Sequence, residues 1–127
     1  MRRTSAALLT SVALTLAVFG CSSKSAEPLN RRDVLDEADR ICREANERIG
    51  AAPADSTTQQ IFLNYAESAR SIARLAERNE QDDIYALMSR VEQATSFRND
   101  EPTPEEVLAV QTVATEVRAA GFAVCGW

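Results

Sequence analysis

The sequence of 127 residues predicts an all-α fold, an antiparallel four-helix bundle with up-and-down connections. Apolar residues recur at steps of three and four in four separate segments, and no segment alternates apolar and polar residues as a strand would. Helix start and stop residues flank these segments. The joins between them are short, which favours antiparallel neighbours.

The first predicted helix begins after Asn30, an N-cap residue followed by Asp33 at the third helical position. Gly50 and Pro53 end it. Cys42 lies beside its apolar stripe. The stripe consists of Val34, Ala38, Ile41, Ala45 and Ile49.

The second predicted helix opens near residues 55–57, where Ser56 and Gln59 have the spacing of a capping box, and it runs to Arg78. Its core positions are Ile61, Phe62, Tyr65, Ala69, Ile72 and Ala76. A third stripe comprises Ile84, Leu87, Val91 and Ala94, and the helix ends near residues 97–99. One helix through both stripes would be about 60 Å long and would outrun its partners, so we place a turn at residues 79–81.

The clearest start signal is Thr103-Pro104-Glu105-Glu106, with Thr as N-cap, Pro at the first helical position and Glu at the third. The stripe of this fourth helix is Val107, Val110, Ala114 and Val117. Gly121 is the expected C-cap. In a bundle with an even number of helices, the end of this helix lies beside the start of the first.

The N-terminus has the pattern of a secretory signal peptide. Arg2 and Arg3 precede a mostly apolar run over residues 6–19, which is short for a membrane-spanning helix. Residues 18–21, Val-Phe-Gly-Cys, then resemble the lipobox of bacterial lipoproteins.

This resemblance implies cleavage between Gly20 and Cys21 by a type II signal peptidase, and a lipid on the Cys21 thiol. The freed amine is often acylated as well, with a fatty acid such as palmitate. The chain then divides into a signal peptide over 1–20, a tether over 21–29 and a helical bundle domain over 30–127. We expect a lipid-anchored protein on the extracytoplasmic face of the cell membrane. The alternative is an ordinary secretory signal that leaves Cys21 as a free thiol.

Lipidation of Cys21 leaves Cys42 and Cys125 as a pair, and an exported protein retains disulfides. We therefore predict a disulfide that pins the C-terminal tail to the first helix. Two buried free thiols are the alternative. The mature part also loosely resembles small uncharacterised actinobacterial envelope lipoproteins, with a Cys in the opening helix and Cys125-Gly126 near the end. That resemblance implies no activity.

Composition excludes several functions. The chain has no histidine, so Ser-His and Cys-His catalytic systems are absent. Its net charge is −5, and loss of the two signal-peptide arginines makes it −7, which disfavours nucleic acid as a partner. The pairs Asp82-Asp83 and Asp100-Glu101 lack the spaced ligands and the glycine of a calcium loop. We expect no metal site and no cofactor.

Acidic residues in the first helix are interpreted as a solvated face, with the pairs Asp36 to Arg40 and Asp39 to Arg43. Two features are candidates for contact with a partner. One is the ladder of Arg70, Arg74 and Arg78, for which neutralisation by Glu67, Glu77 or acids on neighbouring helices, such as Asp82 and Asp83, is the alternative. The other is Trp127, for which packing against the first helix is the alternative.

These observations predict a lipid-anchored binding or scaffolding module of the cell envelope, without enzymatic activity, whose partner is another envelope protein. The main alternative is a carrier of a small apolar ligand or lipid in the bundle interior. The many alanines on the stripes favour close helix packing over a cavity. A carboxylate-based enzyme is a third possibility.

Overall fold

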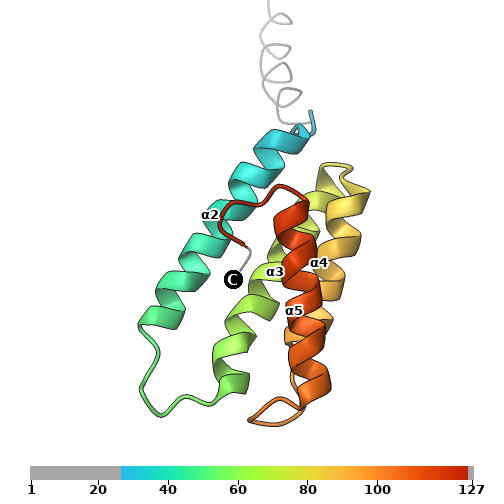
Figure 1. Ribbon diagram of the computed structural model, residues 1–127. Helices are drawn as coiled ribbons and strands as arrows, with labels where there is room; N and C mark the ends of the chain where they lie inside the picture. Colours follow the sequence, from blue (N-terminus) through green and yellow to red (C-terminus); the bar gives the residue numbers. More distant parts are fainter. Residues whose placement is uncertain (1–26, 126–127) are drawn as a thin grey trace, which may run out of the picture.

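The computed structural model describes residues 27–125, which form four helices in chain order (Figure 1). They are α2 (Arg31–Gly50), α3 (Thr58–Arg78), α4 (Asp82–Thr95) and α5 (Pro104–Ala119). Successive helices run in opposite directions. The predicted all-α four-helix fold is thereby confirmed. Among these helices, none is both long enough and apolar enough to cross a membrane.

Local capping signals define most helix ends. The Asn30 side chain accepts the N–H of Asp33 at 2.9 Å, and Thr103 and Glu106 form the predicted capping box of α5. The box at the start of α3 is displaced by one residue from the prediction, because it joins Thr57 and Gln60. At the end of α5, Ala120 is the cap residue.

The ends of α4 and α5 differ from those predicted from the sequence. The last helical residue of α4 is Thr95, whose hydroxyl donates to the carbonyl of Val91 at 2.7 Å. Gly121 follows the cap of α5 with φ of +104°, a conformation suited to glycine, and there the chain turns back.

The predicted turn at residues 79–81 is present and separates α3 from α4. Glu80 adopts a positive φ of 59°, and the N–H of Gln81 donates to the carbonyl of Ala76 at 2.9 Å. In this turn, therefore, a residue other than glycine adopts the left-handed backbone conformation. The Asn79 side chain supports it by donating to the carbonyl of Leu75 at 2.8 Å.

The helices pack in sequence order, and one side of the bundle lacks close helix packing. α3 packs against α2 and more extensively against α4, and α4 packs against α5. No Cα atom of α2 lies within 8 Å of a Cα atom of α5, so these two helices are not packed closely against each other. Figure 1 shows the C-terminal tail reaching across to the middle of α2, where it contacts Asp39 and Cys42. The tail therefore takes the place of the missing packing over part of the length of the bundle.

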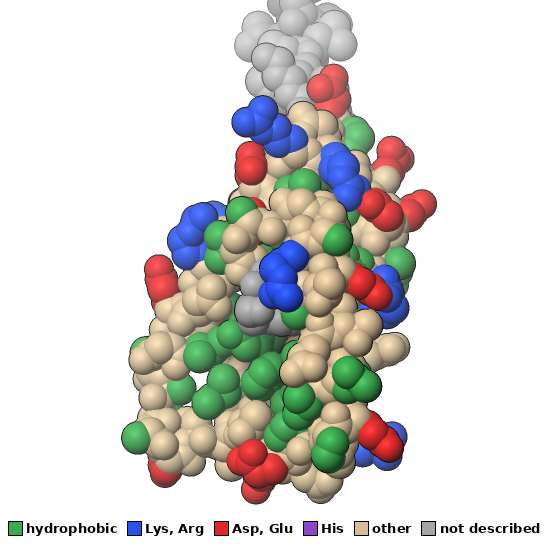
Figure 2. Space-filling view, viewed as in Figure 1, with side chains coloured by type: hydrophobic (Ala, Val, Ile, Leu, Met, Phe, Trp, Pro, Cys, Tyr) green, Lys and Arg blue, Asp and Glu red, His purple; other side chains and the backbone are tan. Residues whose placement is uncertain are grey.

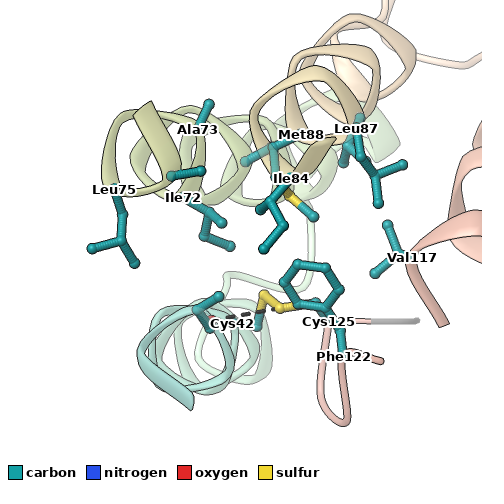
Figure 3. Close-up of a cluster of buried hydrophobic side chains, with 14 of the residues drawn as sticks. Cys42, Ile72, Ala73, Leu75, Ile84, Leu87, Met88, Val117, Phe122 and Cys125 are labelled. Atoms are coloured by element: carbon teal, nitrogen blue, oxygen red, sulfur yellow. Dashed lines mark hydrogen bonds between the residues drawn. A yellow bond between two sulfur atoms is a disulfide. The ribbon is translucent and has the colours of Figure 1, made fainter. Parts of the chain in front are cut away.

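We call the half of the molecule that contains this tail the closed half; it comprises residues 31–42, 69–91 and 113–125. Six of the seven largest fully buried side chains of the described chain lie there, and the seventh is Thr95. Figure 3 shows Ile72, Ile84, Met88, Val117 and Phe122 of the tail directed toward one another beside the disulfide. The six are Val34, Ile72, Ile84, Met88, Val91 and Val117.

The open half comprises residues 43–68 and 92–112. Phe97 closes its α3 to α4 side, where the ring is buried and lies 5.0 Å from the ring of Phe62 between centroids. On the side between α2 and α5, no described residue takes the position that the tail holds in the closed half. Figure 1 shows α2 diverging from the other helices in this half.

Candidate functional site

The disulfide joins Cys42 of α2 to Cys125 at the end of the described chain. The two Cα atoms are 5.3 Å apart, the sequence separation is 83 residues, and both side chains are buried. Phe122 is buried in the same cluster. The prediction that a disulfide pins the tail to the first helix is confirmed.

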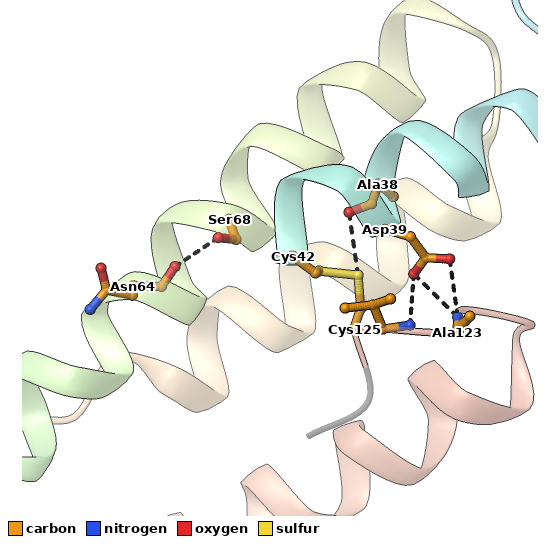
Figure 4. The surroundings of a disulfide bond; sticks show 8 residues. Ala38, Asp39, Cys42, Asn64, Ser68, Ala123 and Cys125 are labelled. Atoms are coloured by element: carbon orange, nitrogen blue, oxygen red, sulfur yellow. Dashed lines mark hydrogen bonds between the residues drawn. A yellow bond between two sulfur atoms is a disulfide. The ribbon is translucent and has the colours of Figure 1, made fainter. Parts of the chain in front are cut away.

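Asp39 provides a second attachment for the tail (Figure 4). Its carboxylate accepts the N–H of Val124 at 2.9 Å and that of Ala123 at 3.2 Å, and the side chain is buried. The predicted solvated pair of Asp39 with Arg43 is therefore wrong. Backbone donors of the returning tail satisfy this carboxylate.

The predicted pair of Asp36 with Arg40 is also wrong. Arg40 forms salt bridges with Glu37 and Glu44 on the same helix. The hydrogen bond from Arg40 lowers the pKa of Glu37, and the charge of Arg40 adds to this effect over the opposing effect of burial. The exposed face of α2 thus carries ion pairs, but with different partners.

Polar contacts also join the helix ends of the closed half. Arg31 forms a salt bridge with Asp83 at 2.5 Å and reaches the carbonyl of Ala120 at 3.4 Å. Partial burial acts to raise the pKa of Asp83, but the hydrogen bond and charge of Arg31 outweigh it and lower the pKa. The N–H of Leu29 donates to the Asn79 side chain at 2.6 Å. The end of α5 thus lies near the start of α2, as predicted.

The apolar stripes continue into the open half, where they lose their cover. Five side chains there lie seven residues, or two helical turns, from a buried core residue and therefore share its helix face. The buried residues are Cys42, Ala69, Ile72, Ala114 and Val117. Their counterparts, which are half-buried or exposed, are Ile49, Phe62, Tyr65, Val107 and Val110.

We call the surface formed by these five counterparts the distal groove. Figure 2 shows hydrophobic side chains gathered in a hollow between α2 and α5 in the open half. Phe62 and Tyr65 contact each other edge to face on α3, with ring centroids 5.3 Å apart. Burial raises the pKa of the Tyr65 hydroxyl. Val107 is 40% exposed. The distal groove is thus a partly solvated continuation of the core.

A small apolar recess lies where the distal groove meets the disulfide. It is lined by residues including Cys42, Tyr65, Met88 and Cys125, and its volume is about 10 Å³. That is room for one water molecule at most. A lipid chain does not fit in this recess, so the carrier alternative gains no support from it.

The arginine ladder lies away from the distal groove. Arg70 forms a salt bridge with Glu92 of the neighbouring helix α4 at 2.8 Å, so for this arginine the alternative of neutralisation by an acid on a neighbouring helix is confirmed. Arg74 and Arg78 are exposed and have no salt bridge to any residue that the structure describes. Helical spacing puts Arg70 about half a turn from Ile72, so the ladder and the distal groove occupy different faces of α3.

Acidic residues do not converge into a metal centre in the part of the chain that the structure describes. Residues 27–125 contain no group of three or more His, Cys, Asp and Glu side chains placed to hold an ion. The pair Asp82-Asp83 lies in the first turn of α4, where acids are favourable at a helix N-terminus.

Several predicted site residues lie outside the described residues. These are the cleavage site at Gly20, the lipidation site at Cys21, and Trp127.

Two features were missed from the sequence. The role of Asp39 depends on a segment 84 residues away, and no local pattern indicates it. The distal groove carries the same periodicity as the buried core, so periodicity alone does not distinguish them. The length of the loop over residues 51–57 is the signal that could have pointed to a diverging α2.

Comparison of the chain with models of protein families, with curated proteins and with solved structures found no match.

Proposed function

We propose that the protein is a lipid-anchored, non-enzymatic binding module of the cell envelope, and that its distal groove binds another envelope protein. The observation that carries this proposal is the apolar stripe left partly uncovered between α2 and α5. Solvated apolar surface that forms a continuous groove is typical of an interaction site. Covering Ile49, Phe62 and Val107 would remove apolar area from water and favour association.

The position of the groove fits an anchored protein. The tether over residues 21–29 leads to the start of α2, and nine residues span at most about 30 Å. The groove lies toward the opposite end of α2, whose 20 residues extend about 30 Å. A lipid on Cys21 would therefore leave the groove directed away from the bilayer and accessible to a partner.

Anchoring is tested by Cys21→Ser, with Ser22→Ala as the control. We expect Cys21→Ser to abolish acylation and to move the protein from the membrane fraction to the soluble fraction, whereas Ser22→Ala stays with the membrane. A Cys21→Ser protein that remains membrane-bound at full length would refute lipid anchoring.

Binding is tested by photo-crosslinking in living cells. A photoreactive amino acid at Val107 probes the distal groove, and the same group at Arg74 probes the opposite region of α3. We expect a discrete crosslinked protein from position 107 and none of comparable yield from position 74. Crosslinks from position 74 alone would move the binding surface to the arginine ladder, and none from either would reject the binding function.

A further inference from the structure

We propose that the segment which occupies the distal groove is a basic amphipathic helix of the partner protein. Its apolar face would lie in the groove and its lysine or arginine residues would flank that face. This inference rests on the proposed binding function and specifies the chemistry of the partner.

The shape of the distal groove favours a helix as the occupant. In the closed half, one non-helical segment over residues 122–125, which bends at residues 123–125, lies between α2 and α5. In the open half, α2 diverges from the other helices before the loop over residues 51–57 (Figure 1), and a hollow with hydrophobic side chains lies between α2 and α5 (Figure 2). A helix is about 10 Å across and presents apolar side chains on one face, as in other grooves bounded by helices.

The side chains of the groove match such a face. Helical spacing puts Phe62 and Tyr65 of α3, Ile49 of α2 and Val110 of α5 on the core-facing sides of their helices, and Phe62 and Tyr65 contact each other. These are aromatic and branched side chains, which accept apolar residues spaced three and four apart on a helix. All five groove residues are uncharged, so the groove itself does not select a partner by charge. Any selection by charge comes from the residues around the groove.

The end of the molecule around the groove is acidic. Residues 47–58 and 96–107, which form the connections at this end, contain six acidic side chains against two arginines, a net charge of −4. Figure 2 shows acidic side chains directly below the opening of the hollow. The six acids are Glu47, Asp55, Asp100, Glu101, Glu105 and Glu106.

None of the six acids forms a salt bridge with another residue of the described chain. Glu106 accepts hydrogen bonds within its capping box, which lower its pKa, and the charge of Arg98 adds to the effect. Glu101 accepts the hydroxyl of Thr58 at 3.0 Å. Charges that lack a salt-bridge partner act over about 10 Å at moderate salt.

The same charge disfavours two other occupants. A second copy of the chain would bring two acidic ends together, with like charges opposed. An anionic lipid surface would be repelled for the same reason. A basic segment gains from the acidic end, and its apolar face gains from the groove.

The test measures binding of synthetic peptides to the mature lipidated protein, residues 21–127, in phosphatidylcholine nanodiscs, with empty nanodiscs as the blank. One 18-residue peptide carries Leu on one helical face and Lys elsewhere, and the matched peptide carries Glu in place of Lys. We expect the Lys peptide to bind about tenfold more tightly at low salt, with a preference that shrinks as salt rises. Equal affinities, or tighter binding of the Glu peptide, would overturn the inference.

Charge variants locate the effect. The triple variant Asp55→Asn, Asp100→Asn, Glu101→Gln should weaken Lys-peptide binding by about three- to tenfold. The control Asp36→Asn, Glu80→Gln, Asp82→Asn removes the same charge at the opposite end and should change binding by less than about twofold. Circular dichroism verifies that both variants fold. An equal loss of Lys-peptide binding in both triple variants would attribute the preference for the Lys peptide to the net charge of the protein and overturn the inference.

The in-cell crosslink from Val107 separates this inference from the proposed function. A captured segment that is amphipathic and basic supports both. A captured segment that is acidic or uncharged leaves the binding function standing and rejects the basic helix. Crosslinking between two copies of this chain would likewise reject it.

Discussion

The closed and open halves of this molecule carry one continuous set of apolar stripes, yet only one half is fully covered. Ile72 is 1% exposed and Val117 is fully buried, whereas Tyr65 and Val110, seven residues earlier on the same faces, are half-buried. The difference comes from the tail, because Phe122 and Cys125 lie over the closed half. A four-helix pattern therefore does not by itself ensure that all four helices enclose the core.

The largest expected effect is the loss of the disulfide that holds the closed half together. Replacing both Cys42 and Cys125 by Ser should lower the free energy of unfolding by about 4 kcal/mol, because the bridge closes a long loop in the unfolded chain. Urea unfolding with and without reductant measures this. Wild type in reductant is the matched control and should resemble the variant. A wild type that is insensitive to reductant would contradict the assigned role of the bridge.

The next effect concerns the second attachment of the tail. Asp39→Ala should lower the free energy of unfolding by about 2 to 3 kcal/mol, because it leaves the N–H groups of Ala123 and Val124 without their charged acceptor. Hydrogen exchange at these two amides should accelerate. Asp36→Ala, an exposed position on the same helix, serves as the control and should leave both amides unchanged. Unaltered exchange in Asp39→Ala would show that the carboxylate does not hold the tail.

A matched pair of core substitutions compares the two halves directly. Val117→Ala in the closed half should cost about 2 kcal/mol, because it removes buried methyl groups and leaves a cavity. Val110→Ala removes the same atoms two turns away and should cost less than about 1 kcal/mol, because the side chain is only half-buried. Denaturant unfolding measures both. Equal costs would mean that the open half is covered as well as the closed half.

The smallest effect is at the salt bridge between Arg31 and Asp83. Asp83→Asn should cost about 0.5 kcal/mol at pH 7, because the pair is largely exposed and screened. The pKa of Asp83 is lowered on folding, so its contribution is present above the unfolded value of 3.8 and is lost as pH falls through the lower folded value. The stability difference between wild type and variant should therefore shrink as pH falls below 3.8. A difference that does not shrink on acidification would assign it to packing.

Local sequence signals were sufficient to predict most of the fold. Asn30, Thr103 and the turn at residues 79–81 act through neighbouring backbone groups, so the sequence around each one defines a helix end. The displaced capping box of α3 reflects competition between adjacent residues, because Ser56 and Thr57 are both good caps and each has Gln three residues later.

Features that depend on contacts between distant parts of the chain were harder to predict from the sequence. The pairing of Cys42 with Cys125 followed from the number of cysteines and the expected export of the chain, and no geometry was needed. The burial of Asp39 requires knowledge of where the tail returns. The distal groove requires knowledge that α2 and α5 are not packed closely against each other, which depends on the course of two loops and the tail. The stripes alone predict a closed bundle.

The central claim is that the open half is solvated in the isolated protein and covered by a partner in the cell envelope. Radical footprinting of the purified protein and of intact envelopes tests it most directly. Ile49, Phe62 and Val107 should be labelled in the purified protein and protected several-fold in envelopes. Buried Phe122 should stay unlabelled in both, and Leu108, which is 63% exposed, should be labelled in both. Groove residues labelled equally in the two samples would contradict the claim.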